Sequence, residues 1–234
     1  MILYANGDSH TAAAEAVNSY AFAEDDRNLV HLGRLPHPAN LAVSWGKKLS
    51  TLLKMAFYCG AESAASNDRI IRTTKEYINN YTQDVTNLFV VIGWSTWERE
   101  EWLIDDVYYQ INASGTDIVP NSHKEKYKEY ITNVNWRHKT NQAHKDIIEL
   151  HKWLDDKSIT HVFFNGNNTF SQIQNKFDFG TSYIEPYNKK FSYNDYLIDN
   201  GISTVSPKSY HFGEDGHTTW AKLLLNYIAK KKLL

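Results

Sequence analysis

Apolar positions along the chain follow two alternating patterns, which predict strands and helices in turn. Short runs rich in β-branched or aromatic residues predict strands, whereas apolar positions spaced three and four apart predict helices. We expect strands near residues 2–6, 56–59, 87–93 and 160–165, with a weaker one near 202–205. We expect helices near residues 9–22, 41–55, 68–82, 97–112, 122–156 and 214–231.

The segment NLFVVIGW, which begins at residue 87, is apolar on both faces of a strand. This is typical of a parallel strand that is buried between two layers of helices. Together with the alternation of strands and helices, it predicts an α/β fold in which helices cover both faces of a mainly parallel sheet.

Proline and glycine are too sparse to mark a linker between domains, with 5 and 11 residues respectively. We therefore predict a single domain over residues 1–234. Two stretches are interpreted as insertions within it: a polar helical one over about 113–156, and an irregular, aromatic-rich one over about 176–201.

Composition narrows the class of partner. The formal net charge of −2 gives no reason to expect nucleic acid as a ligand. The single cysteine excludes an internal disulfide and a zinc site built on several thiolates. No basic segment precedes the first strand and no apolar run approaches a membrane span, so we expect a soluble, cytoplasmic protein without a membrane partner.

In parallel α/β sheets, functional side chains gather at the carboxyl ends of the strands. Ser9 lies just after the first predicted strand, where a serine is either a helix N-cap or a nucleophile beside backbone N–H groups. A nucleophilic serine requires a histidine as base. His144 and His151 lie seven apart on a helical pattern and are interpreted as packed or solvated. His211, near the C-terminus, is the better candidate.

His211 and His217 flank Glu214 and Asp215, which raises the question of a metal site. Their spacing of six differs from the i, i+4 spacing of a helical zinc pair, so we predict no metal there.

Five stretches, taken in order, resemble the SGNH (GDSL) hydrolase superfamily, and more narrowly the short SGNH-like proteins of bacteriophages. These are GDS after the first strand, SWGKKLS (44–50), AESAASNDRIIRTT (61–74), VVIGWSTWERE (90–100) and HFGEDGHTTWA near the C-terminus. The resemblance implies a three-layer α/β/α sandwich, flavodoxin-like in its mainly parallel sheet. It implies Ser9 as nucleophile, His211 as base, an oxyanion hole that includes the Ser9 amide, and no cofactor.

The chain departs from the family pattern at three positions. Ala64, with Gly60 as the competing assignment, stands where the second motif has the glycine whose amide lines the oxyanion hole. Ser95 stands where the third motif has asparagine, and Lys208 where the catalytic aspartate would precede His211. A backbone carbonyl or another acid, such as Asp215, would then have to orient His211.

Three further residues have two interpretations each. Asn67 either lines the site or caps a helix. Trp94 and Trp97 either form a sugar-stacking or acyl-binding wall or belong to the core. Asp8 is expected to support the site from beside Ser9.

The sequence thus predicts a serine hydrolase that cleaves an ester, with an O-acyl group on a sugar or another small ester as substrate. The alternatives are a catalytically weak SGNH-fold protein that binds a glycan or another protein, and an O-acyltransferase.

Overall fold

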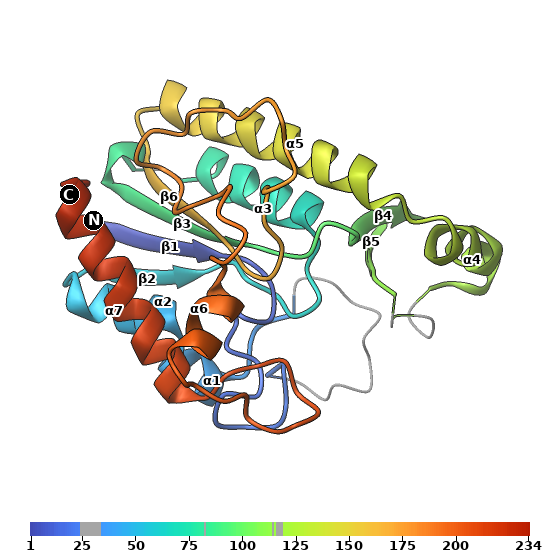
Figure 1. Ribbon diagram of the computed structural model, residues 1–234, viewed down its shortest axis with the longest axis horizontal. Coiled ribbons are helices and arrows are strands. Elements are labelled where there is room, and N and C mark those ends of the chain that lie inside the picture. The colour runs from blue at the N-terminus through green and yellow to red at the C-terminus, as the bar shows by residue number, and fades with distance from the viewer. Residues whose placement is uncertain (24–33, 82, 114, 116–118) are drawn as a thin grey trace.

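The computed structural model describes residues 1–23, 34–81, 83–113, 115 and 119–234. Its central sheet contains four strands in the spatial order β2-β1-β3-β6, and every neighbouring pair is parallel (Figure 1). The strands are β1 (Ile2–Asn6), β2 (Ala56–Cys59), β3 (Leu88–Trp94) and β6 (Thr160–Asn165). The predicted strands at 2–6, 56–59 and 160–165 are confirmed, and the fourth is shifted by one residue.

Helices cover both faces of this sheet (Figure 1). One face packs against α3 (Asn67–Asn79) and α5 (Trp136–Asp156), and the other against α2 (Trp45–Leu52) and α7 (Glu214–Lys231). Side chains of β3 alternate between the two cores: Val90 and Ile92 lie in the first, and Phe89 and Val91 in the second. The predicted three-layer α/β/α class is confirmed.

The predicted helix over 9–22 is wrong, because residues 8–19 form turns. Its alanines suggested a helix, yet Ala12, Ala13 and Ala14 are all buried, whereas a surface helix would bury only one stripe. The buried amide of Asn40 fixes the loop by accepting from the N–H groups of residues 17 and 18 and donating to the carbonyls of residues 18 and 20.

The predicted helix over 97–112 is also wrong, since this segment forms an antiparallel hairpin of β4 (Glu100–Ile104) and β5 (Val107–Ile111). The connecting residues Asp105 and Asp106 have φ angles of 50° and 61°. Positive φ at both central residues is the mark of a type I′ turn, which matches the twist of a two-residue hairpin.

The remaining helices differ less from the prediction. The stretch 41–55 is divided at Ser44 into α1 (Pro38–Val43) and α2, and Ser44 caps α2 by accepting from Lys47 N–H. The stretch 122–156 consists of η2 (Asn121–His123), α4 (Lys124–Thr132) and α5. The predicted helix over 214–231 is confirmed as α7, and that over 68–82 as α3. The weak strand near 202–205 is only an isolated bridge between Thr204 and Phe212.

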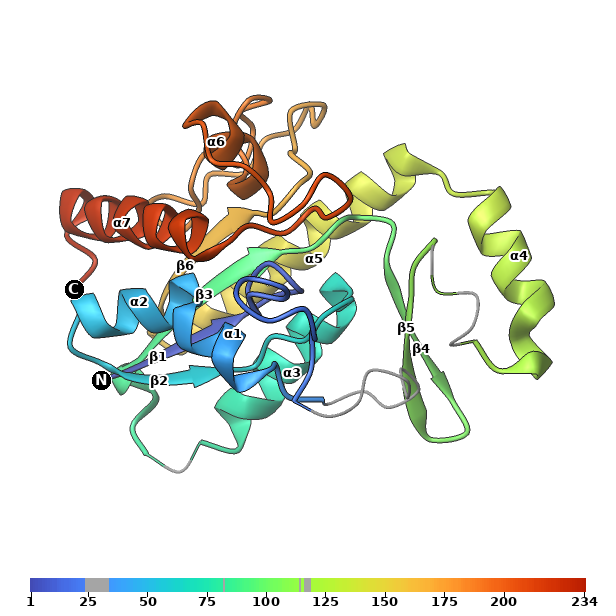
Figure 2. The same cartoon turned by 90° about the horizontal axis from the view of Figure 1, so that it is seen from below.

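The two predicted insertions contribute to the cores. α5 lies within the stretch 113–156, but its buried residues Ile147, Leu150 and Leu154 belong to the first core of the sheet. The hairpin and α4 instead stand beside the sheet with a small core of their own (Figure 2). The stretch 176–201 buries Tyr183, which forms a parallel bridge with Phe163 at the sheet edge, and ends in α6 (Tyr193–Asp199).

A short 3-10 helix, η1 (Val85–Asn87), precedes β3. Among the described residues, every helix is too short or too polar to cross a membrane.

Candidate active site

The loop after β1 holds Ser9 in a series of tight turns. The Asp8 carbonyl accepts from Thr11 and Ala12 N–H, and the Ser9 carbonyl accepts from Ala14 N–H. No helix follows Ser9 in this described segment, so the interpretation of Ser9 as a helix N-cap is wrong. The residue is 7% exposed, and neither its hydroxyl nor its N–H bonds to another described residue.

Gly7 allows the loop to pack closely against β3. A Cβ at this position would lie 2.1 Å from Thr11 Oγ1 and 2.7 Å from the Gly93 carbonyl oxygen. Any side chain would therefore push the Ser9 loop away from the end of β3.

His211 reaches the same loop from the segment before α7. Its Nδ1 lies 3.1 Å from Glu15 Oε2, and its ring centroid lies 5.3 Å from that of His10. A hydrogen on Nδ1 bound to the carboxylate leaves Nε2 with the lone pair that a general base requires. The described structure contains no hydrogen bond between Ser9 Oγ and His211.

Glu15 provides a carboxylate beside His211, a partner that the sequence alone did not identify. Its φ of 63° lies in the left-handed region, and Ser209 Oγ donates to Glu15 Oε2 at 2.5 Å. Burial would raise the pKa of Glu15, but hydrogen bonds from Ser209 and His211 and the charge of His211 outweigh it and lower the pKa. The carboxylate is therefore held in its charged form beside the imidazole.

This contact corrects the predicted role of Asp215 as partner of His211. Asp215 Oδ1 accepts from Gly216 N–H in the first turn of α7, and the residue is exposed. Lys208, which occupies the position of the family's aspartate, is exposed.

The second motif lies on a loop that is hydrogen-bonded to the Ser9 loop. Glu62 N–H donates to the Gly7 carbonyl at 3.3 Å, which joins the loops after β1 and β2. Gly60 N–H donates to the Ala5 carbonyl and is therefore unavailable as an oxyanion donor. Ala64 N–H has no partner among the described residues, and its φ of 68° is the conformation that a glycine adopts at least cost. Of the two predicted assignments, the geometry favours Ala64.

Ser95 is not free to act as the predicted oxyanion donor. Its hydroxyl donates to Asp8 Oδ2 at 2.9 Å and accepts from Arg99 Nη1 at 2.9 Å. Arg99 also lies 3.3 Å from Asp8 Oδ2, so Asp8 forms an ion pair with this cation and neutralises its charge. An Asp8–Arg99 ion pair thus lies where the SGNH pattern has a neutral asparagine amide.

Asn67 connects the second and third motifs. Its Oδ1 accepts from Ser95 N–H at 2.9 Å and its Nδ2 donates to the Ser95 carbonyl at 3.3 Å. Ser66, and not Asn67, is the N-cap of α3. The side-chain amide of Asn67 thus fixes the end of β3, and both its oxygen and its nitrogen are engaged in these bonds.

Of the two interpretations of Trp94 and Trp97, the structure supports the core and contradicts the substrate wall. Trp94 is 0% exposed and packs edge-on against Phe163. Trp97 is 4% exposed and stacks on Phe170 with ring centroids 4.6 Å apart. Both belong to the first core, where the large apolar surface of the indole ring is removed from water.

Two further histidines lie beside the site and were not singled out as functional. Burial lowers the pKa of His10 to about 4 and that of His217 to about 3, so both are neutral at pH 7. His217 Nδ1 accepts from Trp45 N–H, and His10 Nε2 lies 3.3 Å from Asn167 Nδ2. They shape the walls around His211 without adding charge to them.

The fold and the site together define an α/β/α protein with a serine, a histidine and a carboxylate at the carboxyl end of a parallel sheet. The chain belongs to DUF6071, a family of unknown function, whose sequence model matches residues 36–175. This match includes Ala64, Asn67 and Ser95, whereas Ser9, Glu15 and His211 lie outside it. No curated protein matches the chain.

Among solved structures, an acetyl xylan esterase from the rumen bacterium Butyrivibrio proteoclasticus is 13% identical over 98% of this chain, with a TM-score of 0.48. A carbohydrate esterase family 2 enzyme with a carbohydrate-binding domain from Corynascus thermopiles is 12% identical over 98% of this chain, with a TM-score of 0.46. The chain spans 64% and 66% of these two proteins. A structure described as a lipolytic protein of the G-D-S-L family from Desulfitobacterium hafniense is 12% identical, with a TM-score of 0.35 over 100% of this chain and 99% of its own.

Proposed function

We propose that this protein is a serine hydrolase of the SGNH type that cleaves a carboxylic ester. The observation that carries the proposal is the contact between His211 Nδ1 and Glu15 Oε2. In a serine hydrolase the carboxylate holds the imidazole in the tautomer that accepts a proton from the nucleophile. Glu15 replaces the family's aspartate in this role, so the lysine at position 208 does not remove the third member of the triad.

The reaction proceeds in two halves. Ser9 Oγ attacks the acyl carbon while His211 Nε2 takes its proton, and His211 then returns that proton to the departing alcohol. Water attacks the acyl-Ser9 ester by the same route and releases the acid. Closure of the Ser9 hydroxyl onto Nε2 accompanies substrate binding, because catalytic hydrogen bonds in unliganded enzymes are commonly longer than in the complex.

Two backbone donors support stabilisation of the oxyanion. The N–H groups of Ser9 and Ala64 are both without partners among the described residues, on loops that Glu62 N–H joins.

We further propose an acylated sugar as the substrate. A cavity of about 510 Å³ adjoins the loop after β2, and its lining includes Gly60, Ala61 and four tyrosines. Tyr58 and Tyr77 stack with ring centroids 4.5 Å apart, and Tyr58 is 48% exposed. Exposed aromatic faces next to polar side chains suit a sugar ring better than a long acyl chain.

Steady-state hydrolysis of 4-nitrophenyl acetate and of acetylated oligosaccharides tests the proposal. Wild type is expected to hydrolyse both, and Ser9→Ala and His211→Ala neither. Tyr58→Ala is expected to raise KM for the sugar ester while leaving hydrolysis of the small ester unchanged. No turnover of any ester by folded wild type would contradict the proposal.

The absence of a hydrogen bond between Ser9 and His211 in the described structure favours one second candidate, a catalytically weak protein that binds a glycan. That candidate predicts oligosaccharide binding by calorimetry that Ser9→Ala leaves intact, without ester turnover. An O-acyltransferase shares the first half-reaction and is distinguished by an acylated sugar product in place of free acid.

A further inference from the structure

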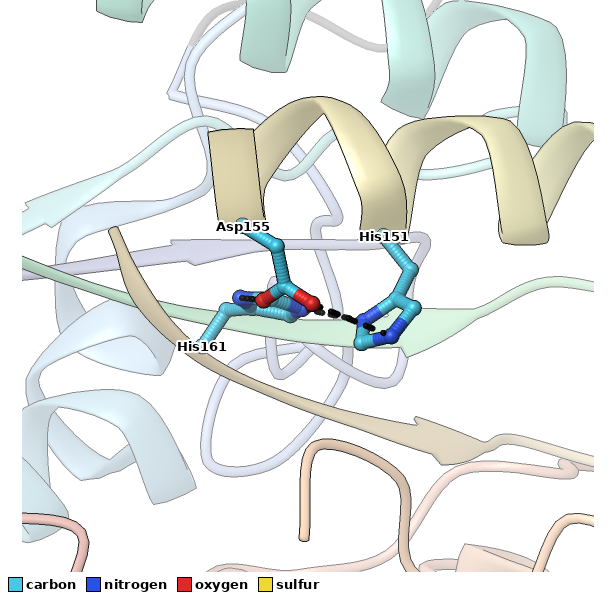
Figure 3. Close-up of side chains that lie close together, drawn as sticks. All are labelled: His151, Asp155 and His161. Carbon is cyan, nitrogen blue, oxygen red and sulfur yellow. Dashed lines mark hydrogen bonds and ion pairs between the residues drawn. The ribbon is translucent and has the colours of Figure 1, made fainter. Parts of the chain in front are cut away.

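A second cluster of ionisable side chains lies between α5 and β6, away from the candidate active site. His151 and Asp155 project from the last turns of α5, and His161 projects from the start of β6 (Figure 3). The Ser9 loop lies at the carboxyl end of the sheet, whereas His161 is the second residue of its strand. Both histidines are buried, and the side chain of Asp155 is 56% exposed.

The hydrogen bonds within this cluster fix the position of one proton. His161 Nδ1 lies 2.8 Å from the Ile159 carbonyl oxygen, which only accepts, so Nδ1 carries the hydrogen. His161 Nε2 then has a lone pair, and it lies 2.8 Å from His151 Nδ1. In the hydrogen-bonded pair, His151 Nδ1 must therefore be the donor.

The other nitrogen of His151 is left in an unfavourable contact. In neutral His151 with a hydrogen on Nδ1, Nε2 carries a lone pair, and this atom lies 3.3 Å from Asp155 Oδ2. Two acceptors would face each other in a partly buried place, so the cluster lacks one positive charge.

Either a proton or a metal ion can supply that charge. A metal ion binds the lone pairs of neutral imidazoles directly and brings its positive charge next to the Asp155 carboxylate.

We propose that His151, Asp155 and His161 bind a divalent transition-metal ion of the zinc type. One ligand atom from each residue lies within 4.8 Å of the others. Ligands about 2.0–2.2 Å from a tetrahedral zinc ion lie roughly 3.3 Å apart. To complete the site, the two imidazoles, whose nearest nitrogens lie 2.8 Å apart, would separate slightly to admit the ion, and the Asp155 carboxylate would move toward them. Two imidazoles and one carboxylate suit zinc better than magnesium or calcium, which prefer oxygen ligands throughout.

The surroundings of the cluster match a metal site in two ways. His161 Nδ1–H donates to a backbone carbonyl, which is the usual way of fixing a metal-binding imidazole and which leaves Nε2 as the ligand atom. Asp155 is exposed, so its carboxylate can adjust to the ion and water can take the fourth position. The site would fasten the end of α5 to the start of β6, which makes the metal structural and independent of Ser9.

Zinc and cobalt(II) titrations of the untagged, chelator-treated full chain test this site. Calorimetry is expected to show that each wild-type chain binds one ion. Bound cobalt(II) is expected to give the absorption band of a tetrahedral complex. His161→Gln and Asp155→Asn are each expected to weaken binding at least tenfold. His144→Gln is the matched control, since His144 lies on the same helix, is also buried, and bonds to Tyr187 outside the cluster.

Thermal unfolding gives a second readout in the same proteins. Zinc is expected to raise the Tm of wild type and His144→Gln in a concentration-dependent way, because only the folded state presents the site. The exposed Asp155→Asn change keeps this test informative even where His161→Gln lowers stability. No binding to wild type, or equal binding by wild type and both cluster variants, would overturn the proposal.

Discussion

Glu15 shows how a single residue can complete the proposed triad from a distant part of the chain. It lies 196 positions from His211, and its left-handed backbone costs about 1–2 kcal/mol, as does such a conformation for any residue with a Cβ. Strain of this kind persists where the surrounding structure holds it, here through Ser209 and His211. No spacing rule links positions 15 and 211, so the sequence could indicate the need for a carboxylate but not its source.

Replacing this carboxylate is expected to slow the reaction of Ser9. Glu15→Gln retains the size of the side chain but removes the charge that stabilises imidazolium, so the rate of ester hydrolysis should fall by about 10² or more, by analogy with serine-protease triads. Asp215→Asn is the control, because its exposed carboxylate bonds only to Gly216 N–H in the first turn of α7, and its rate should stay near that of wild type. A rate loss in Asp215→Asn with none in Glu15→Gln would contradict the assignment.

Ala64 is the second residue in a left-handed conformation at the site. Ala64→Gly should relieve the steric cost of the Cβ and raise the free energy of unfolding by about 0.5–1 kcal/mol after the entropy of glycine is subtracted. Urea unfolding measures this. Ala65→Gly, at the neighbouring buried position, should instead lower stability, and equal losses in both variants would contradict the conformation of Ala64.

At the scale of elements, the four strands of the central sheet were predictable, whereas two segments predicted as helices form a loop and a hairpin. Runs such as LFVVI report burial directly, because both faces of an inner parallel strand are apolar. The segment over 9–22 failed because its alanines pack on all sides of an irregular loop. The prediction for residues 97–112 was wrong because a two-residue turn at Asp105 and Asp106 divides this segment into two strands, and Asp-Asp is not a typical sequence for such a turn.

The hairpin can be distinguished from the predicted helix by one substitution. Asp106→Gly should stabilise the protein by a few tenths to about 1 kcal/mol, because glycine adopts the positive φ of a type I′ turn without steric cost. Within a helix the same change would lower stability by about 1 kcal/mol or less. The sign of the change in thermal or urea unfolding decides between the two.

At the scale of the whole molecule, buried neutral histidines make stability depend on pH. His10 and His217 have a lowered pKa in the folded protein, so between about pH 6.5 and 4 the unfolded state binds more protons than the folded state. Their contribution to stability is complete above pH 6.5 and is lost as the pH falls toward about 4 and then 3.

His217→Gln should therefore flatten this acid dependence. Each such histidine contributes a slope of up to about 1.4 kcal/mol per pH unit, and glutamine can still accept from Trp45 N–H. Urea unfolding from pH 7 to 4.5 measures the slopes. An unchanged slope in His217→Gln would show that this histidine does not titrate as its burial requires.

The family match and the candidate triad occupy different parts of the molecule. The matched residues 36–175 provide most of the sheet and the loops of Ala64 and Ser95, while both ends of the chain provide Ser9, Glu15 and His211. Ordered motifs were enough to predict Ser9, His211 and the parallel sheet that would bring them together. The motifs were not enough to predict which side chains at the site are already bonded or buried. The bond of Ser95 to Asp8 and the burial of Trp94 both depend on tertiary packing.

The most direct test is intact-mass analysis after incubation with a fluorophosphonate. The proposed triad predicts one covalent adduct on wild type, mapped by peptide sequencing to Ser9, absent from Ser9→Ala and formed much more slowly in His211→Ala. The claim that Ser9 is an activated nucleophile would be contradicted in two cases. In the first, wild type forms no adduct although circular dichroism shows that it is folded; in the second, the adduct persists in Ser9→Ala.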